Sequence, residues 1–343
     1  MSAPVENILP RVQSPRVERE IETTKVNAVT TLRARTLLAL PLCAAIAGAV
    51  HWWAAKKQPM PETAYFRFLA IAFGAGFLLA IAQRFSVGVR RWMEQTAPIL
   101  AAGVMLLAVW ETATSGLRLL PLPYFPGPGA VLRSMLDDRK LLLESTWASL
   151  VRLLAGYGIG TVIALITGVC IGWFRSARYW GMPALKVIGP IPATAWIPLA
   201  MVLSPNPDLT PIGLVAIAVW FPVTMLTVSG IANTRASYLD VARTLGATQK
   251  YLVFRVAIPA AMPNIFIGLF MGLGASFLTL VVAETVGVKS GLGWYIEWAR
   301  NYAEYGKVFG ALIIMAAFFS TIMTVLFKVR DRVLVWQKGM IKW

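Results

Sequence analysis

The chain has 343 residues, of which 57% are hydrophobic and only 14% are charged. This composition leaves too little polar surface for an ordinary soluble globular protein of this size, so it indicates an all-α polytopic membrane protein. The net charge of +16 does not indicate a nucleic-acid partner, because the basic residues are dispersed between apolar runs and form no single basic face or arm.

Eight apolar runs are long enough to cross a membrane as helices, each of which needs about 20 residues. They cover residues 36–55, 63–82, 97–115, 146–172, 184–203, 211–231, 263–286 and 307–327. About 35 polar residues precede the first run, far more than the short basic start of a cleavable signal peptide. We therefore expect the first span to stay in the mature protein.

The distribution of Lys and Arg predicts the orientation of these spans. With a cytoplasmic amino terminus, 21 of the 32 basic residues fall in the inner segments 1–35, 83–95, 173–186, 232–262 and 328–343. The segments that decide the orientation hold Arg84, Arg90 and Arg91, and Lys328, Arg330, Arg332, Lys338 and Lys342. By the positive-inside rule, both termini are predicted to be cytoplasmic.

Cysteine and histidine give no sign of a metal or redox site. Cys43 and Cys170 lie inside apolar runs, without the spacing of a zinc or disulfide motif, so we interpret them as packing residues. The single histidine, His51, lies beside Trp52 and Trp53, where we expect it to anchor the chain at the membrane interface. No catalytic residue, metal site or bound cofactor is predicted.

The segment 232–262 between the sixth and seventh runs has the local signals of a folded loop. Tyr238–Leu245 can form a short helix, Gly246 can end it, and Thr248 can cap the next helix. Pro259 and Pro263 then restrict the backbone before the next apolar run. A single acid, Asp240, stands against four basic residues, Arg235, Arg243, Lys250 and Arg255.

The stretch DVARTLGATQKYLVFRVAIP, residues 240–259, resembles the EAA loop of membrane subunits in binding-protein-dependent ATP-driven importers. It departs from that pattern by an Asp for Glu, a Val for Ala and a Leu replaced by Ile258. In that family the loop is a coupling helix that docks on a cytoplasmic ATPase. The resemblance implies this role for Asp240, Val241, Ala242, Arg243, Gly246, Ala247, Ile258 and Pro259. An ordinary amphipathic helix at the membrane interface is the alternative.

The resemblance extends from about residue 97 to the end and points to the nitrate, sulfonate, taurine and bicarbonate branch. It rests on FPGPGAVLRSM (125–135), GPIPATAWIPLAMV (189–202), VVAE (281–284) and SGLGWYI (290–296). SPNPDLTP (204–211) departs from the branch. The implied organisation is a basic leader (1–35), two additional helices (36–95) and a six-helix core (96–343) that contains the 232–262 loop.

The added segments have two interpretations. The two helices and the leader can brace the core and fix its orientation. Alternatively, the leader contacts anionic lipid or the ATPase through its basic residues Arg11, Arg16, Arg19, Lys25, Arg33 and Arg35.

Three prolines between Pro190 and Pro198 predict a broken helix in the fifth run. Broken helices at membrane depth can line a cavity. The candidates for the wall of the pathway or for its gate are therefore Ile191, Pro192, Ala193, Thr194 and Trp196. A kink that only shapes packing is equally compatible with the pattern.

Three charged residues inside the runs stand out, Glu111, Arg152 and Glu284. A buried charge is costly unless it is paired, so we expect Arg152 to neutralise Glu111 or Glu284. The alternative is that Glu111, Arg152 and Glu284 belong to the pathway or to its outer gate. In that role the Arg152 guanidinium would attract an anionic solute.

Two further patterns concern packing and the membrane interface. Small residues at helical spacing predict close helix contacts at Gly156, Gly160, Gly168, Gly172, Gly268 and Gly272. An aromatic belt, or alternatively a docking surface for a solute-binding protein, is predicted for Trp294, Tyr295, Trp298, Tyr302 and Tyr305.

The resemblance implies the permease subunit of an ATP-driven importer for a small anion, such as nitrate, a sulfonate, taurine or an organic acid, in a bacterial inner membrane. The implied partners are ATPase subunits that bind ATP and Mg, an extracytoplasmic solute-binding protein, a second permease copy and membrane lipid. The chain itself has no glycine-rich loop ending in Gly-Lys-Ser or Gly-Lys-Thr. The rival hypothesis is an ion-coupled secondary transporter, but we find no repeated halves. A membrane-embedded enzyme is less well supported.

Overall fold

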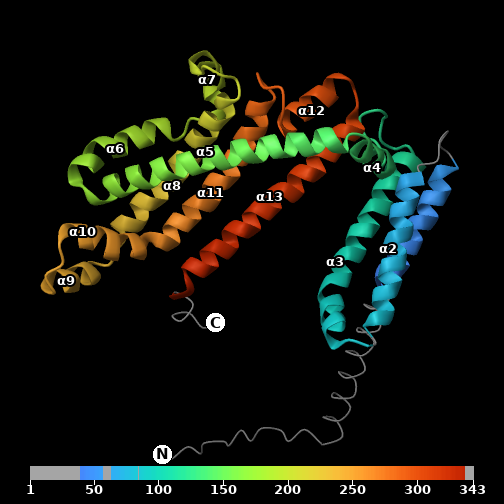
Figure 1. Ribbon diagram of the computed structural model, residues 1–343, viewed down its shortest axis with the longest axis horizontal. Helices are drawn as coiled ribbons and strands as arrows, with labels where there is room; N and C mark the ends of the chain where they lie inside the picture. Colours follow the sequence, from blue (N-terminus) through green and yellow to red (C-terminus); the bar gives the residue numbers. More distant parts are fainter. Residues whose placement is uncertain (1–38, 57–62, 84, 337–343) are drawn as a thin grey trace, which may run out of the picture. The chain divides into compact units, whose positions relative to one another are not determined.

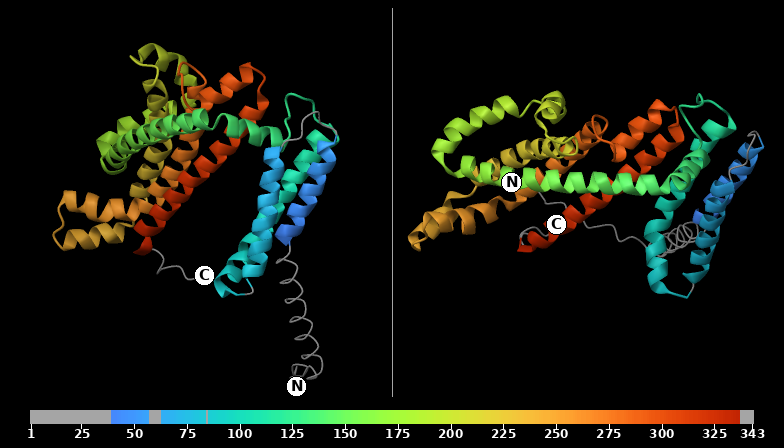
Figure 2. Two further views of the ribbon diagram at one scale, coloured as in Figure 1. Left: turned by 45° about the vertical axis from the view of Figure 1, so that its right-hand side comes forward. Right: turned by 45° about the horizontal axis from the view of Figure 1, so that its top comes forward.

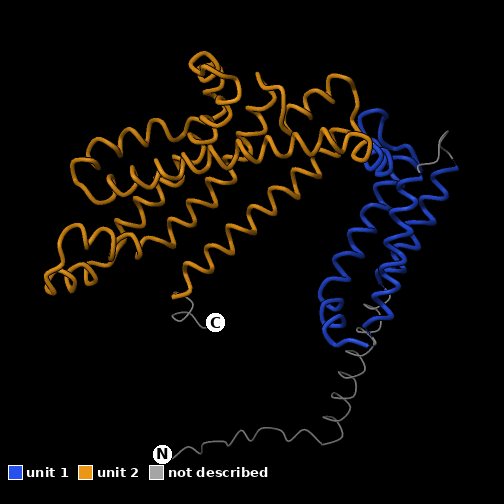
Figure 3. The backbone as a smooth tube through the Cα atoms, viewed as in Figure 1, with its two compact units in different colours: residues 1–133 blue, residues 134–343 orange. Residues whose placement is uncertain are grey.

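The computed structural model describes residues 39–56, 63–83 and 85–336, and every regular element in these ranges is helical. The predicted all-α class is therefore confirmed. The chain divides into two compact units, residues 1–133 and 134–343 (Figure 3). The basic leader, Arg84, Lys338 and Lys342 lie outside the described residues.

The first unit contains antiparallel apolar helices joined by short connections. Its elements are a helix over Ala39–Ala55, α2 (Thr63–Ala82), α3 (Val87–Glu111), a π-helical turn η1 (Thr112–Gly116) and the start of α4 (Pro128–Asp137). Ala47, Tyr65, Leu69 and Ala108 are buried together between the three long helices. Small residues on the Ala39–Ala55 helix and on α3 let these helices approach closely.

The second unit is built around long helices, with a bent segment, α9 and α10, that extends beyond them (Figures 1 and 2). Its elements are α5 (Arg139–Trp173), α6 (Arg175–Ile188), η2 (Ala193–Trp196), α7 (Ile197–Leu203), α8 (Leu209–Ala232), α9 (Ala236–Thr244), α10 (Gln249–Tyr251), η3 (Leu252–Ala257), α11 (Ile258–Glu284), α12 (Leu292–Asn301) and α13 (Tyr305–Val333). Its central core combines α5, α8 and α11 through Leu153, Ala164, Val215, Val219, Val223 and Leu280.

Close approach of α5 to α8 depends on glycine. A Cβ atom on Gly160 would lie 2.5 Å from the carbonyl oxygen of Ala216, and one on Gly156 would lie 2.6 Å from that of Ile212. Backbone atoms cannot move aside as a flexible side chain can, so the two helices need these glycines to touch. The predicted close packing is confirmed at these positions.

The predicted count of eight spans is not confirmed. Among the described residues, six helices are long and apolar enough to cross a membrane, or seven if one bent pair counts as a span. The bent pair is the predicted fifth run, where α6 and the segment Ala193–Leu203 meet at 85°. Pro190 and Pro192 explain the bend, because each removes a backbone donor. The break is thus confirmed, while the described part of the first run, the helix Ala39–Ala55, is shorter than a candidate span.

The helix that contains the predicted run 263–286 begins earlier than expected, inside the 232–262 loop. Gln249–Glu284 is helical throughout, although Pro259 and Pro263 lie inside this range. The π-helical turn η3 directly precedes Pro259, and such local widening relieves the clash between a proline ring and the preceding turn. The prolines therefore leave the helix unbroken.

Candidate functional site

An exposed elbow formed by α9, Gly246 and α10 is the first candidate site. Gly246 has a φ of +81°, in the left-handed region that glycine adopts at low cost, and the chain turns there. The Thr248 hydroxyl then accepts a hydrogen bond from the Tyr251 backbone N–H at 3.4 Å. The predicted helix end and helix cap are both confirmed.

The elbow presents apolar side chains away from the rest of its unit. None of the α9 residues is buried, and the exposed fractions of Val241 and Leu245 are 60% and 82%. Most of the remaining predicted coupling residues also lie on the elbow, but Ile258 and Pro259 lie beyond it, at the start of α11. Asp240, Arg243, Gly246 and Pro259 are exposed, and Ala242, Ala247 and Ile258 are half-buried. Exposed apolar residues on a helix that is too short and polar to be a span are typical of a contact with another protein.

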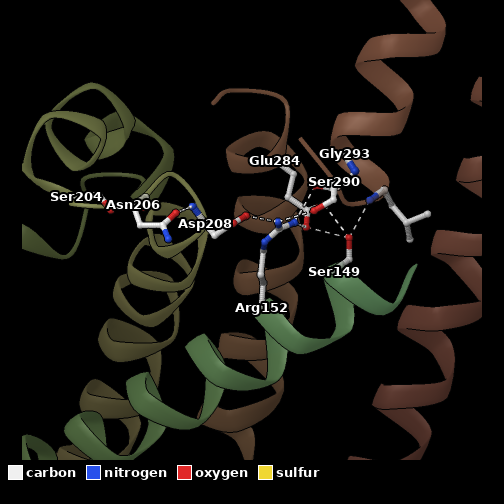
Figure 4. A network of polar contacts seen from close by, with 9 residues as sticks. Ser149, Arg152, Ser204, Asn206, Asp208, Glu284, Ser290 and Gly293 are labelled. Atoms are coloured by element: carbon white, nitrogen blue, oxygen red, sulfur yellow. Dashed lines mark hydrogen bonds and ion pairs between the residues drawn. The ribbon is translucent and has the colours of Figure 1, made fainter. Parts of the chain in front are cut away.

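A buried polar network around Glu284 is the second candidate site (Figure 4). The Glu284 side chain is 1% exposed and accepts hydrogen bonds from the Ser149 hydroxyl, from Arg152 at 3.1 Å and from the Gly293 N–H at 3.0 Å. Ser149 also accepts a bond from the Leu292 N–H at 2.8 Å. The carboxylate therefore lies at the amino-terminal end of α12, where backbone N–H groups favour negative charge.

Arg152 links this carboxylate to two further segments. One guanidinium nitrogen donates to the Ser290 carbonyl at 2.8 Å, and the other donates to the Ser290 hydroxyl at 2.8 Å and to Asp208 at 2.5 Å. Asp208 is 62% exposed and is held by a bond from its N–H to the Asn206 side chain at 2.9 Å. The divergent SPNPDLTP stretch thus supplies an acid to the network.

Arg152 forms ion pairs with two acids of the network, Asp208 and Glu284. One guanidinium faces two carboxylates, as expected for a structural ion pair. The pathway role of Arg152 stays a prediction. The expected pairing of Arg152 with Glu284 is confirmed. Sequence reasoning missed Asp208, Ser149 and Ser290, and only the turn-forming string around Asp208 offered a signal.

Glu111 has a different partner, in the first unit. Its carboxylate lies 2.5 Å from Nδ1 of His51, and the two residues are 2% and 4% exposed. The Tyr65 ring contacts the imidazole edge to face, with 5.0 Å between ring centroids. His51 is therefore a buried partner of an acid, and its assignment as an interfacial anchor is wrong. The second oxygen of Glu111 has no hydrogen-bond partner among the described residues.

The broken helix borders a cavity of about 420 Å³. Pro192, Thr194 and Trp196 line it together with residues of α8 and α11, among them Trp220 and Met271. The indole N–H of Trp196 is buried without a hydrogen-bond partner in the described part of the chain. This placement is compatible with a wall of the pathway, as predicted, and also with a packing kink.

The aromatic residues of α12 divide into buried and partly exposed groups. Tyr295 is fully buried and donates a hydrogen bond to Asp138 at 2.8 Å, so its assignment to an aromatic belt is wrong. Burial, followed by this bond to an acid, raises the pKa of Tyr295 above its usual value. The Trp298 ring stacks on the Trp294 ring with 6.2 Å between centroids, and it contacts the tilted Tyr302 ring with 5.6 Å between centroids.

Comparisons with known proteins agree with this architecture. Residues 72–334 match the family model described as binding-protein-dependent transport system inner membrane component. A putative aliphatic sulfonates transport permease protein of Bacillus subtilis is 30% identical over 66% of this chain and 80% of its own. The taurine transport system permease protein of Escherichia coli is 26% identical over 66% of this chain and 85% of its own length. The bicarbonate transport system permease protein of Synechococcus elongatus is 29% identical over 63% of this chain and 84% of its own length.

Proposed function

We propose a specific role for this chain, which belongs to the family of binding-protein-dependent transport system inner membrane components. Membership makes it a multi-pass permease subunit of an ABC importer. The proposed role is to form the pathway for a small anionic solute and to receive the force of ATP hydrolysis through the α9–α10 elbow. Both termini are assigned to the cytoplasm, on the same side as the elbow.

The exposed elbow is the observation that carries the coupling role. Val241 and Leu245 are apolar and exposed, and they lie outside the candidate spans. A cleft on an ATPase subunit would bury these side chains. The ATPase would also bind the ATP and Mg that drive transport, and this chain would bind no cofactor and perform no covalent chemistry.

An anionic solute is supported by the names of the relatives. Aliphatic sulfonates, taurine and bicarbonate each carry an anionic group, and the proteins named for them align over most of their own length. Nitrate and organic acids belong to the same chemical class. We assign delivery and selection of the solute to an extracytoplasmic solute-binding protein, and the second half of the pathway to a second copy of this chain.

Within the chain, the proposed pathway contains Pro192, Thr194 and Trp196, which line one cavity. Glu111, Arg152 and Glu284 are assigned to structure, because each lies in a buried pair. The 1–35, 36–95 and 96–343 organisation stays a prediction, as does the role of the leader and of the added helices.

Gly246 provides a sharp test of the coupling role. Gly246→Val should abolish solute uptake and reduce the amount of ATPase that copurifies, because a β-branched residue at φ +81° costs about 1–2 kcal/mol and changes the turn. Gly246→Asn is the matched control, since Asn tolerates the left-handed conformation. A Cβ atom there meets no other atom within 4 Å, so the variants differ in backbone strain and not in packing.

Uptake in whole cells and affinity purification from native membranes, followed by mass spectrometry, would measure both effects. Equal uptake and equal ATPase recovery for Gly246→Val and the unaltered chain, at equal protein level, would contradict the coupling role.

A further inference from the structure

A second cavity, also about 420 Å³, lies between the end of α5 and the helical segment that follows the elbow. Its apolar walls come from α5 and from the η3–α11 segment, through Leu165, Ile166, Val169, Cys170, Trp173, Val253, Phe254 and Ile258. We name it the α5–η3 groove. Ile166 and Phe254 are 60% and 65% exposed, so the groove opens to the surroundings of the helix bundle.

The polar side chains that line the groove come from one short helix. Gln249 and Lys250 belong to α10, whereas the remaining lining residues are apolar or aromatic, with Cys170 among them. The flanking segments 173–178 and 249–258 contain four basic residues and no acidic residue. In the described ranges, no acidic side chain pairs with Arg175, Lys250 or Arg255.

From this arrangement we propose that the α5–η3 groove binds an anionic phospholipid, with an acyl chain along the apolar wall and the headgroup beside Lys250. An apolar slot lined by one unpaired lysine and flanked by further unpaired cations fits an amphiphile with a negatively charged headgroup. Ile166 lies on a helix that is long and apolar enough to span a membrane, which places the groove beside lipid. Basic pockets between spanning helices bind anionic headgroups by the same attraction.

The bound lipid would contact both α5 and the segment that joins the elbow to α11. It would therefore favour one arrangement of that connection over another, according to its relative affinity for each. This consequence for coupling depends on the proposed function, whereas the binding itself depends only on the membrane location of the chain.

Trp173 lines the groove and provides a direct reporter. The purified complex would be placed in nanodiscs containing phosphatidylglycerol or phosphatidylcholine with brominated acyl chains, which quench nearby indoles. The contribution of Trp173 is the difference between the unaltered chain and Trp173→Phe. We expect brominated phosphatidylglycerol to quench this contribution, with an apparent affinity about fivefold higher than that of phosphatidylcholine for the one lysine.

Lys250→Gln should remove the preference for phosphatidylglycerol, and Lys250→Arg should keep it. Lys186→Gln is the matched control, because Lys186 is also exposed but does not line the groove. Native mass spectrometry of retained lipid gives an independent readout for the same variants.

Loss of the preference in Lys186→Gln as well as Lys250→Gln, or equal quenching by both lipids in the unaltered chain, would overturn the proposal. Absence of any Trp173 quenching would also overturn it and would indicate that protein, such as a second copy, covers the groove. Neither measurement uses ATP or solute, so its failure leaves the proposed transport function untouched.

Discussion

Single residues in the second unit show how a charge can be kept in a membrane helix. Glu284 is buried at the end of α11, where a guanidinium, a hydroxyl and a backbone N–H all donate to its carboxylate. Gly291 makes this possible, since a Cβ atom there would lie 2.5 Å from the carboxyl group. The network therefore joins α5, α11 and the loop before α12 by polar contacts that a sequence pattern does not reveal.

Replacing Arg152, which is paired with the buried Glu284, should reduce folding stability far more than replacing the exposed Asp208. Arg152→Gln leaves the buried Glu284 carboxylate without its counter-charge, and we expect a loss of about 3–5 kcal/mol of folding free energy. Asp208→Asn removes a contact whose acid is 62% exposed, so the loss should be under about 1 kcal/mol. Thermal unfolding of the detergent-purified chain would measure both.

The double variant Arg152→Gln/Glu284→Gln is the control for this prediction. It removes both charges and should recover much of the stability lost in Arg152→Gln. A double variant that is as unstable as the sum of its single variants would contradict the pairing.

The pair of His51 and Glu111 leads to a similar prediction in the first unit. His51→Leu leaves a carboxylate buried at 2% exposure and should destabilise the chain by about 3–5 kcal/mol. His51→Leu/Glu111→Leu replaces the pair by apolar side chains and should be close to the unaltered chain in stability. Protein level in membranes and melting temperature in detergent would show whether the second substitution rescues the first.

At the scale of helices, contact between α5 and α8 depends on which glycine faces the partner. Gly160→Ala places a Cβ atom 2.5 Å from a backbone oxygen of α8 and should cost about 1–3 kcal/mol. Gly158→Ala is the matched control, because a Cβ atom there meets nothing within 4 Å. Melting temperatures of the two variants would test the contact. Equal values would contradict it.

Local sequence signals predicted most helices and their ends, but they did not predict which side chains contact one another between helices. The predicted span 63–82 coincides with α2, and Gly246 and Thr248 end and begin helices as their conformational preferences require. By contrast, His51 lies 60 residues from Glu111 and Asp208 lies 56 residues from Arg152. Such partners depend on how helices pack, which periodicity and capping do not specify.

Across the second unit as a whole, one helix connects the two candidate sites. Gln249–Glu284 begins at the elbow and ends at the buried carboxylate of the network, over 36 residues. At 1.5 Å per residue, this helix is about 54 Å long. A movement imposed on the elbow would therefore reach the Arg152 network through continuous helix. This gives a physical route by which the proposed ATP-driven closure would change the other end of the unit.

The most direct test of the account is uptake by proteoliposomes that contain this chain with its copurified partners. Solute-binding protein loaded with an anionic solute would be added outside the vesicles, and ATP would be enclosed inside. We predict uptake that requires ATP and persists when ionophores collapse every ion gradient. Uptake without ATP, driven by a proton or sodium gradient, would contradict the account and would support an ion-coupled secondary transporter.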